Sequence, residues 1–179
     1  MNLAGAFKVQ ELDNGYELVD GVAMHAVNGE RFQIPHPVLK KHVRAGHFVE
    51  LRIDSPRFSV HPDAPERCTC PLCDEETSKP ILSHENPATL LPLPPQDVPS
   101  RGWGEEFWAQ VVERDGCYFR ALVDNPLHEE PLHGLKLGDP IVFRDDHILA
   151  VHGVHRQQIV EDMDADDLEE LARWVSSLK

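Results

Sequence analysis

Residues 107–123 read FWAQVVERDGCYFRALV, and this stretch decides the fold expected for the chain. Two runs of alternating apolar residues flank Asp115-Gly116, and an Asp-Gly pair in that position strongly favours a two-residue hairpin turn. The turn predicts a register in which these pairs share one face: Arg114 with Cys117, Val112 with Phe119, Gln110 with Ala121, and Trp108 with Val123. Because side chains alternate along a strand, Cys117 is expected at the turn end of a largely apolar surface.

Further short strands are expected on both sides of this hairpin. Phe48–Asp54 is the clearest, because Val49, Leu51 and Ile53 alternate with charged residues. Residues 141–143 follow a turn at 135–140, and residues 148–151 are a candidate for another strand. Near the N-terminus, Asn14-Gly15 separates apolar runs at 7–10 and 16–19, which favours a second hairpin. These elements predict an α+β fold dominated by an antiparallel β-sheet of short strands.

One short helix is expected in the N-terminal half of the chain. His36-Pro37 opens a run in which Val38, Leu39, His42 and Val43 recur at helical spacing, and Ala45-Gly46 closes it. Proline is well suited to the first helical position and glycine to the position just past the end. The helix is therefore predicted to lie directly before the strand at 48–54.

A second helix is expected at the C-terminus, over residues 164–179. Acidic residues crowd its N-terminal end, where the helix dipole stabilises negative charge, and apolar residues recur at helical spacing at Leu168, Leu171, Val175 and Leu178. The favoured interpretation is that this apolar stripe packs on the sheet and the acidic face is solvated. The alternative is a docking element for a basic partner, which an exposed Trp174 beside the stripe would support.

Composition narrows the class of protein. The chain has 179 residues, with 31 Asp and Glu against 17 Lys and Arg, giving a net charge of −14. This length suits a single domain over residues 1–179. So acidic a chain repels phosphate backbones, which argues against nucleic-acid partners. The same charge would speed encounter with a basic protein partner, although a charge of this kind mostly keeps a protein in solution. No apolar run is long enough to cross a membrane, and no leader pattern opens the chain, so a soluble cytoplasmic protein is expected.

The segment over residues 55–100 interrupts the regular pattern. Prolines, which cannot donate to a β-ladder, gather in its second half at Pro87, Pro92, Pro94, Pro95 and Pro99. An irregular stretch this long inside a compact domain needs something other than a hydrophobic core to hold it. The sequence therefore predicts an irregular or metal-stapled insertion.

Three of the four cysteines of the chain lie in this insertion. Cys70 and Cys73 are separated by two residues, a spacing that lets both sulfurs bind one tetrahedral ion. We predict a structural zinc, which takes four protein ligands, at Cys68, Cys70, Cys73 and His84. His61 and Cys117 are alternatives for the fourth ligand. Two other interpretations stay open: reduced thiols in an irregular loop, or a thiol redox pair, which the carboxylates at 74–76 disfavour.

Three histidines near the C-terminal end of the sequence suggest an alternative function, a metal-dependent enzyme. His147, His152 and His155 lie near Asp145 and Asp146 in the sequence, and such groups can assemble a metal-dependent active site. The sequence contains neither a Gly-x-Ser-x-Gly nor a His-Glu-x-x-His motif, and no phosphate-binding glycine loop accompanies the histidines. A protein without catalytic residues is therefore favoured over an enzyme of unknown reaction.

Three stretches resemble the YegJ-like family of uncharacterised bacterial proteins: GERFQIPHPVLKKHVRAGHFVELRI at 29–53, GEEFWAQVVERDGCYFRALVDNPLH at 104–128 and LKLGDPIVFRDDHI at 135–148. The resemblance covers about half of the chain and excludes both the insertion and the C-terminal helix. It implies a small α+β fold and brings no catalytic residues. Some of the family resemble immunity or regulatory proteins. The function predicted overall is a non-enzymatic acidic binding or regulatory protein with a structural zinc, in the manner of immunity proteins.

Overall fold

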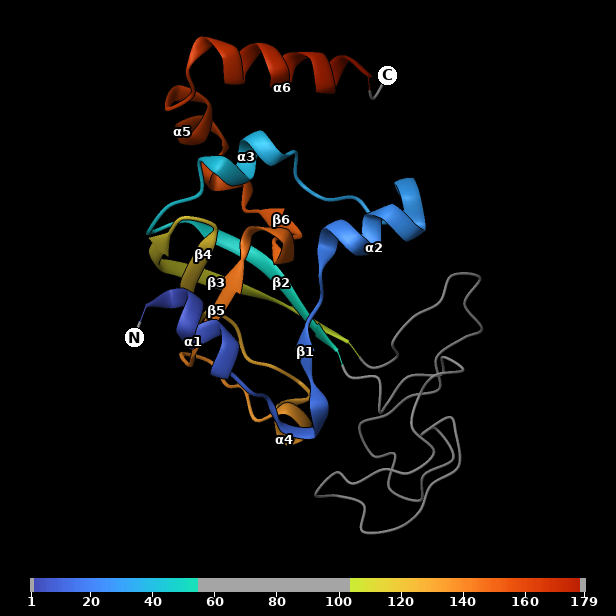
Figure 1. Ribbon diagram of the computed structural model, residues 1–179, viewed down its shortest axis with the longest axis vertical. Helices are drawn as coiled ribbons and strands as arrows, with labels where there is room; N and C mark the ends of the chain where they lie inside the picture. Colours follow the sequence, from blue (N-terminus) through green and yellow to red (C-terminus); the bar gives the residue numbers. More distant parts are fainter. Residues whose placement is uncertain (1, 55–103, 178–179) are drawn as a thin grey trace.

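The computed structural model describes residues 2–54 and 104–177 and places them around one strongly curved antiparallel sheet (Figure 1). The sheet has six strands in the order β1-β2-β3-β4-β5, and β6 pairs with β2 alongside β1. The strand bounds are β1 Glu17–Leu18, β2 Phe48–Asp54, β3 Glu105–Asp115, β4 Tyr118–Val123, β5 Pro140–Arg144 and β6 Ala150–Val151. The predicted α+β class with short antiparallel strands is confirmed.

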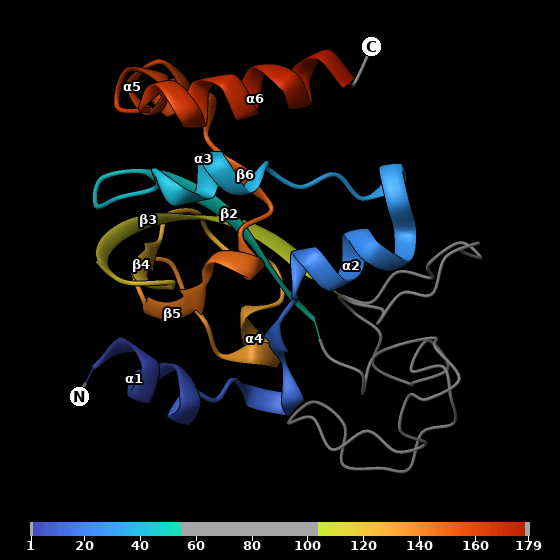
Figure 2. The ribbon, with the colours of Figure 1, turned by 45° about the horizontal axis from the view of Figure 1, so that its top comes forward.

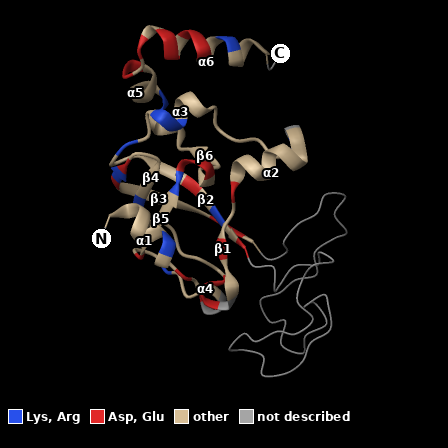
Figure 3. Cartoon of the chain, in the orientation of Figure 1, with Lys and Arg blue, Asp and Glu red and all other residues tan. Residues whose placement is uncertain are grey.

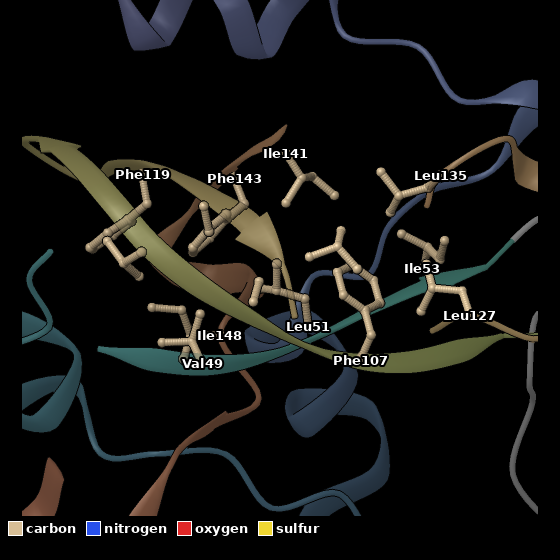
Figure 4. Close-up of a cluster of buried hydrophobic side chains, with 14 of the residues drawn as sticks. Val49, Leu51, Ile53, Phe107, Phe119, Leu127, Leu135, Ile141, Phe143 and Ile148 are labelled. Carbon is tan, nitrogen blue, oxygen red and sulfur yellow. The ribbon is translucent and has the colours of Figure 1, made fainter. Parts of the chain in front are cut away.

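The core lies on the concave side of the sheet, where side chains of β2, β3, β4 and β5 point toward one another (Figure 4). Val49, Leu51 and Ile53 of β2 are fully buried, as the alternation predicts. On β4 and β5, the rings of Phe119 and Phe143 stack with their centroids 5.3 Å apart. Alternate residues of β2 and β3 therefore fill the core, and the residues between them form the outer face of the sheet.

The β3–β4 hairpin exists, but its predicted register is wrong. Asp115 pairs with Tyr118, so the two turn residues are Gly116 and Cys117, one position later than expected. A bulge at Val112 then shifts the register again. Cys117 consequently lies exposed at the hairpin tip as a free thiol, not on an apolar face.

The predicted N-terminal hairpin is also wrong. Residues Leu3–Val9 form helix α1, capped by the side chain of Asn2, which accepts from Gly5 N at 2.9 Å. Asp13–Gly15 forms a 3₁₀ turn, η1, instead of a hairpin turn, and the strand that follows it, β1, pairs with β2. The Asn-Gly signal therefore marks a change of direction between a helix and an edge strand.

The remaining helices lie outside the sheet (Figure 2). The predicted short helix is confirmed as α3, Pro37–Lys41, with His36 as its N-cap. The other helical elements are α2 Gly21–Asn28, η2 Gly29–Arg31, α4 Glu130–His133, η5 Asp145–His147, η6 Gly153–His155, α5 Arg156–Glu161 and α6 Ala165–Ser177. Among the described residues, no helix is long and apolar enough to cross a membrane.

Helix α6 confirms the predicted C-terminal helix but does not pack on the sheet. It lies on α3, at the opposite side of α3 from the strands (Figures 1 and 2). A small second core of Val38, Ile159 and Met163 joins this part of the chain to α3, with Leu171 packed against it. Leu168 and Val175 are exposed, so most of the described stripe is not covered.

Candidate functional site

The predicted zinc ligands Cys68, Cys70, Cys73 and His84 lie outside the described residues, as does the alternative ligand His61. The other alternative ligand, Cys117, is exposed at the hairpin tip. Among residues 2–54 and 104–177, no group of three or more His, Cys, Asp or Glu side chains is arranged to hold a metal ion.

The late histidines do not form one cluster. His147, in η5, is buried, and its Nδ1 accepts a hydrogen bond from the backbone N–H of Arg144 at 3.0 Å. Its ring packs against Phe7 of α1, with centroids 5.5 Å apart. This histidine therefore closes the turn after β5, whereas His152 and His155 lie together elsewhere.

His152 and His155 join an aromatic cluster that sequence reasoning did not identify. The ring of His155 stacks on His47 at 4.6 Å and on Phe48 at 5.5 Å between centroids. His152 meets the indole of Trp108 at 5.0 Å in an edge-on arrangement. The cluster therefore joins η6 to the start of β2 and to the middle of β3.

Burial favours the neutral form of two histidines of this cluster. Burial, followed by the proximity of the partner histidine, lowers the pKa of His47, and burial and then His152 lower the pKa of His155. The Nδ1 atom of His47 accepts the backbone N–H of Arg44 at 3.4 Å, which requires an unprotonated Nδ1. Gln158 approaches His47, but the buried Nε2 atom of that ring lacks a well-formed hydrogen bond among the described residues.

Beside this cluster, Glu50 lies on the outer face of β2. It pairs directly with Trp108 of β3 and with Ala150 of β6. Burial, followed by repulsion from Glu106, raises the pKa of the Glu50 carboxyl. Arg52, two positions along the same strand face, donates to Glu106 at 2.8 Å.

The sequence placed Trp108 on the same face as Val123 and so missed this site. In the structure Ala109 pairs with Val123, and both are buried, so Trp108 faces the opposite way. The alternation within β2 does place Glu50 on the outer face. The proximity of the carboxylate to the indole depends on the β2–β3 register, which no local pattern encodes.

A second polar cluster lies at the far end of β3 and is structural. The Glu105 carboxylate accepts the backbone N–H groups of His128 and Glu129 at 2.6 and 3.0 Å, and His133 Nε2 lies 3.2 Å from it. His133 Nδ1 accepts the N–H of Leu135 at 3.0 Å, so Nε2 carries the proton and donates to Glu105. The pair fastens the short helix α4 to the sheet.

The acidic helix α6 contacts a basic element of its own chain. Its buried Asp167 accepts Lys41 Nζ at 2.7 Å and lies 2.7 Å from His42 Nε2, both at the end of α3. These hydrogen bonds, Lys41 first and His42 second, lower the pKa of Asp167. A second ion pair, Arg44 with Asp162, lies 2.8 Å apart.

The exposed surface of α6 combines charged and apolar residues. Acidic residues, drawn in red in Figure 3, make up most of the N-terminal half of the helix. Leu168 is 38% exposed and Val175 is 46% exposed, whereas Trp174 is partly buried against His36, with ring centroids 5.2 Å apart. Leu168 and Val175, and not Trp174, are therefore the exposed large apolar side chains of the described helix.

Comparisons of this chain with protein-family models, with curated proteins and with solved structures found no match. The resemblance to the YegJ-like family therefore stays a prediction.

Proposed function

We propose that this is a non-enzymatic acidic protein that binds a basic protein partner through α6. The observation that carries the proposal is the pair Leu168 and Val175, which lies exposed on one side of a helix rich in carboxylates. The exposed acidic residues of this region are Glu161, Asp162, Asp164, Asp166, Glu169 and Glu170. This surface is complementary to an amphipathic segment of a partner, whose apolar face would contact Leu168 and Val175 while its Lys or Arg residues contact the carboxylates.

The partner is expected to be basic because the whole chain is acidic. A net charge of −14 speeds encounter with a positively charged protein and repels an acidic one. Leu168 is 38% exposed and Val175 46% exposed, so covering the rest of each side chain contributes roughly 1 kcal/mol, which is less than half of the value for burying a fully exposed one. Charge therefore favours the encounter, and the apolar row stabilises the complex.

A 14-residue amphipathic helix made of Lys and Leu is a suitable probe. Its affinity for the full chain, measured by fluorescence anisotropy, should fall on the order of tenfold or more in the Leu168→Asp/Val175→Asp double variant. The matched control is Leu137→Asp, because Leu137 is 56% exposed but lies between α4 and β5. Equal weakening by the control, or no loss in the double variant, would contradict binding through α6.

We also propose that Cys68, Cys70, Cys73 and His84 hold a structural zinc in a reducing compartment such as the cytoplasm. The support is the Cys-x-x-Cys spacing and the third cysteine beside it. Purified protein should contain about one zinc per chain, and Cys70→Ser/Cys73→Ser should lose both the zinc and thermal stability. Cys117→Ser is the control, and loss of zinc in that variant would instead identify Cys117 as a ligand.

A further inference from the structure

The outer face of the sheet holds a carboxylate between an indole ring and a small residue. Glu50 lies opposite Trp108 on one side and opposite Ala150 on the other. Residues paired in this way have Cβ atoms about 4.5–5.5 Å apart, so the carboxylate of Glu50 stands beside the indole. His152 packs against the same indole in an edge-on arrangement, with ring centroids 5.0 Å apart.

No described residue neutralises Glu50. Its carboxylate makes no ion pair or hydrogen bond with residues 2–54 or 104–177. Arg52 lies two positions along the same face, but its Nη1 donates to Glu106 Oε1 at 2.8 Å. Partial burial and the neighbouring Glu106 both disfavour the ionised form of Glu50, which raises its pKa. The free protein thus keeps a partly desolvated anion on this face without a described counter-ion.

We propose that Glu50 and Trp108 together bind a single arginine side chain of a partner protein. A cation placed between them would neutralise Glu50 and contact the face of the indole. The strand partners of Glu50 are Trp108 and Ala150, and Arg52, the cation two positions along the same face, is paired with Glu106.

Arginine fits these two groups better than lysine. The guanidinium group is planar, so it stacks on an indole ring while it donates two parallel N–H bonds to one carboxylate. An ammonium group is a compact, strongly hydrated charge and makes only one of these contacts well. The site is therefore expected to distinguish the two cations, which a merely acidic surface does not do.

This inference goes beyond the proposed role of α6, because the site lies on β2 and β3 and uses no residue of that helix. The arginine can belong to the same basic partner, but each surface has its own variants. If the protein binds the Lys-Leu helix but not an arginine peptide, only the site on the sheet is overturned. If it binds the arginine peptide but not the Lys-Leu helix, only the role of α6 is overturned.

The test is a titration of the ¹⁵N-labelled full chain with capped tripeptides that differ only in the central residue. The peptides are acetyl-Gly-Arg-Gly-amide, its lysine analogue and its citrulline analogue, which is neutral but nearly the same shape as arginine. The reporter is the indole N–H signal of Trp108, assigned with the Trp108→Phe variant. The arginine peptide should shift this signal to saturation, the lysine peptide should bind at least about threefold more weakly, and the citrulline peptide should not saturate.

Glu50→Gln removes the charge and keeps the shape of the side chain. It should weaken the arginine peptide on the order of tenfold, since a charged hydrogen-bonded pair is lost. Glu113→Gln is the matched control, because Glu113 lies on β3 and is exposed, with Arg120 2.9 Å away. Equal affinities for the three peptides, unchanged binding in Glu50→Gln, or equal loss in Glu113→Gln would overturn the proposal.

Discussion

The side-chain amide of Gln10 forms two hydrogen bonds with the backbone of Val142. Its Nε2 donates to Val142 O at 2.9 Å, and its Oε1 accepts from Val142 N at 2.7 Å. Val142 is the middle residue of β5, the edge strand of the sheet. Pro140 and Arg144 are the other two residues of β5 whose backbone N–H positions face away from β4. Neither offers a free N–H, because Arg144 donates to His147 and proline has none. Side chains thus cover an edge that would otherwise pair with another strand.

Gln10→Leu should therefore both destabilise the protein and uncover the edge of β5. Removal of the two hydrogen bonds leaves the backbone groups of Val142 unpartnered where they are partly buried, which costs about 1–3 kcal/mol in the free energy of unfolding. Urea denaturation measures this loss. The uncovered edge should also promote dimers, which sedimentation velocity detects at raised protein concentration.

Gln33→Leu is the control for this prediction. Gln33 is exposed and makes no described side-chain hydrogen bond, so the same substitution should change the free energy of unfolding by less than about 0.5 kcal/mol. If Gln10→Leu behaved like this control, the amide of Gln10 would not be needed to close the edge of β5.

The sequence predicted those elements whose signal is local. The strand β2 shows a strict alternation over its own residues, and α3 begins with His36-Pro37. Gln10 gives no such signal, because its partner Val142 lies 132 residues away. The N-terminal helix α1 has only seven residues, and its sequence predicts part of a hairpin because its contacts with β4 and β5 are not visible in that stretch.

The misplaced hairpin register shows why the site could not be predicted. An Asp-Gly pair indicates a turn but does not decide whether Asp115 belongs to the turn or to the strand. Here Asp115 is the last strand residue, and the bulge at Val112 cannot be read from local propensity. The displaced turn alone would leave Trp108 on the same face as Val123, because it moves the pairing by two positions. The bulge at Val112 moves it by a single position and reverses the face, so it decides whether the indole shares the face of Val123 or that of Glu50.

The turn itself allows a second prediction. Gly116 has a φ of +61°, and a Cβ added there would meet nothing within 4 Å. Gly116→Ala should therefore destabilise the fold through backbone strain alone, by about 1 kcal/mol. Cys117→Ser at the next position should change stability by less than about 0.5 kcal/mol, because the thiol is exposed. Urea denaturation of the two variants checks both values. A large loss in the free energy of unfolding of Cys117→Ser would show that Cys117 is buried, as the sequence predicts, and not exposed.

A third prediction concerns the attachment of α6. Asp167 is the acceptor for both Lys41 and His42, so Asp167→Asn should loosen α6 from α3 without disturbing the sheet. Native-state hydrogen exchange should show faster exchange in α6 and unchanged exchange in β2 and β3. Asp166→Asn is the matched control, because Asp166 is the exposed neighbour in the same helical turn and has the same charge. Similar exchange in the two variants would show that only the charge at the helix N-terminus matters.

The last prediction is a loss of stability in mild acid. Burial lowers the pKa of His47, His133, His147 and His155 below the ordinary value of 6.5. In His47, His133 and His147 the Nδ1 atom also accepts a backbone N–H, which a protonated ring cannot do. The unfolded chain therefore binds more protons than the folded chain in this range. Stability should be fully present above about pH 6.5 and should fall as the pH is lowered through the depressed folded-state values.

His155→Phe isolates one part of this effect. Phenylalanine keeps a ring against His47 and Phe48 but cannot titrate, and it removes the titratable neighbour that, after burial, lowers the pKa of His47. The urea midpoint of this variant should therefore fall less between about pH 7 and about pH 5.5 than that of the unaltered protein. The control is His128→Phe, because His128 is exposed and its side chain makes no described hydrogen bond. Equal pH dependence in the two variants would mean that the stacked pair does not contribute, leaving the acid sensitivity to His133 and His147.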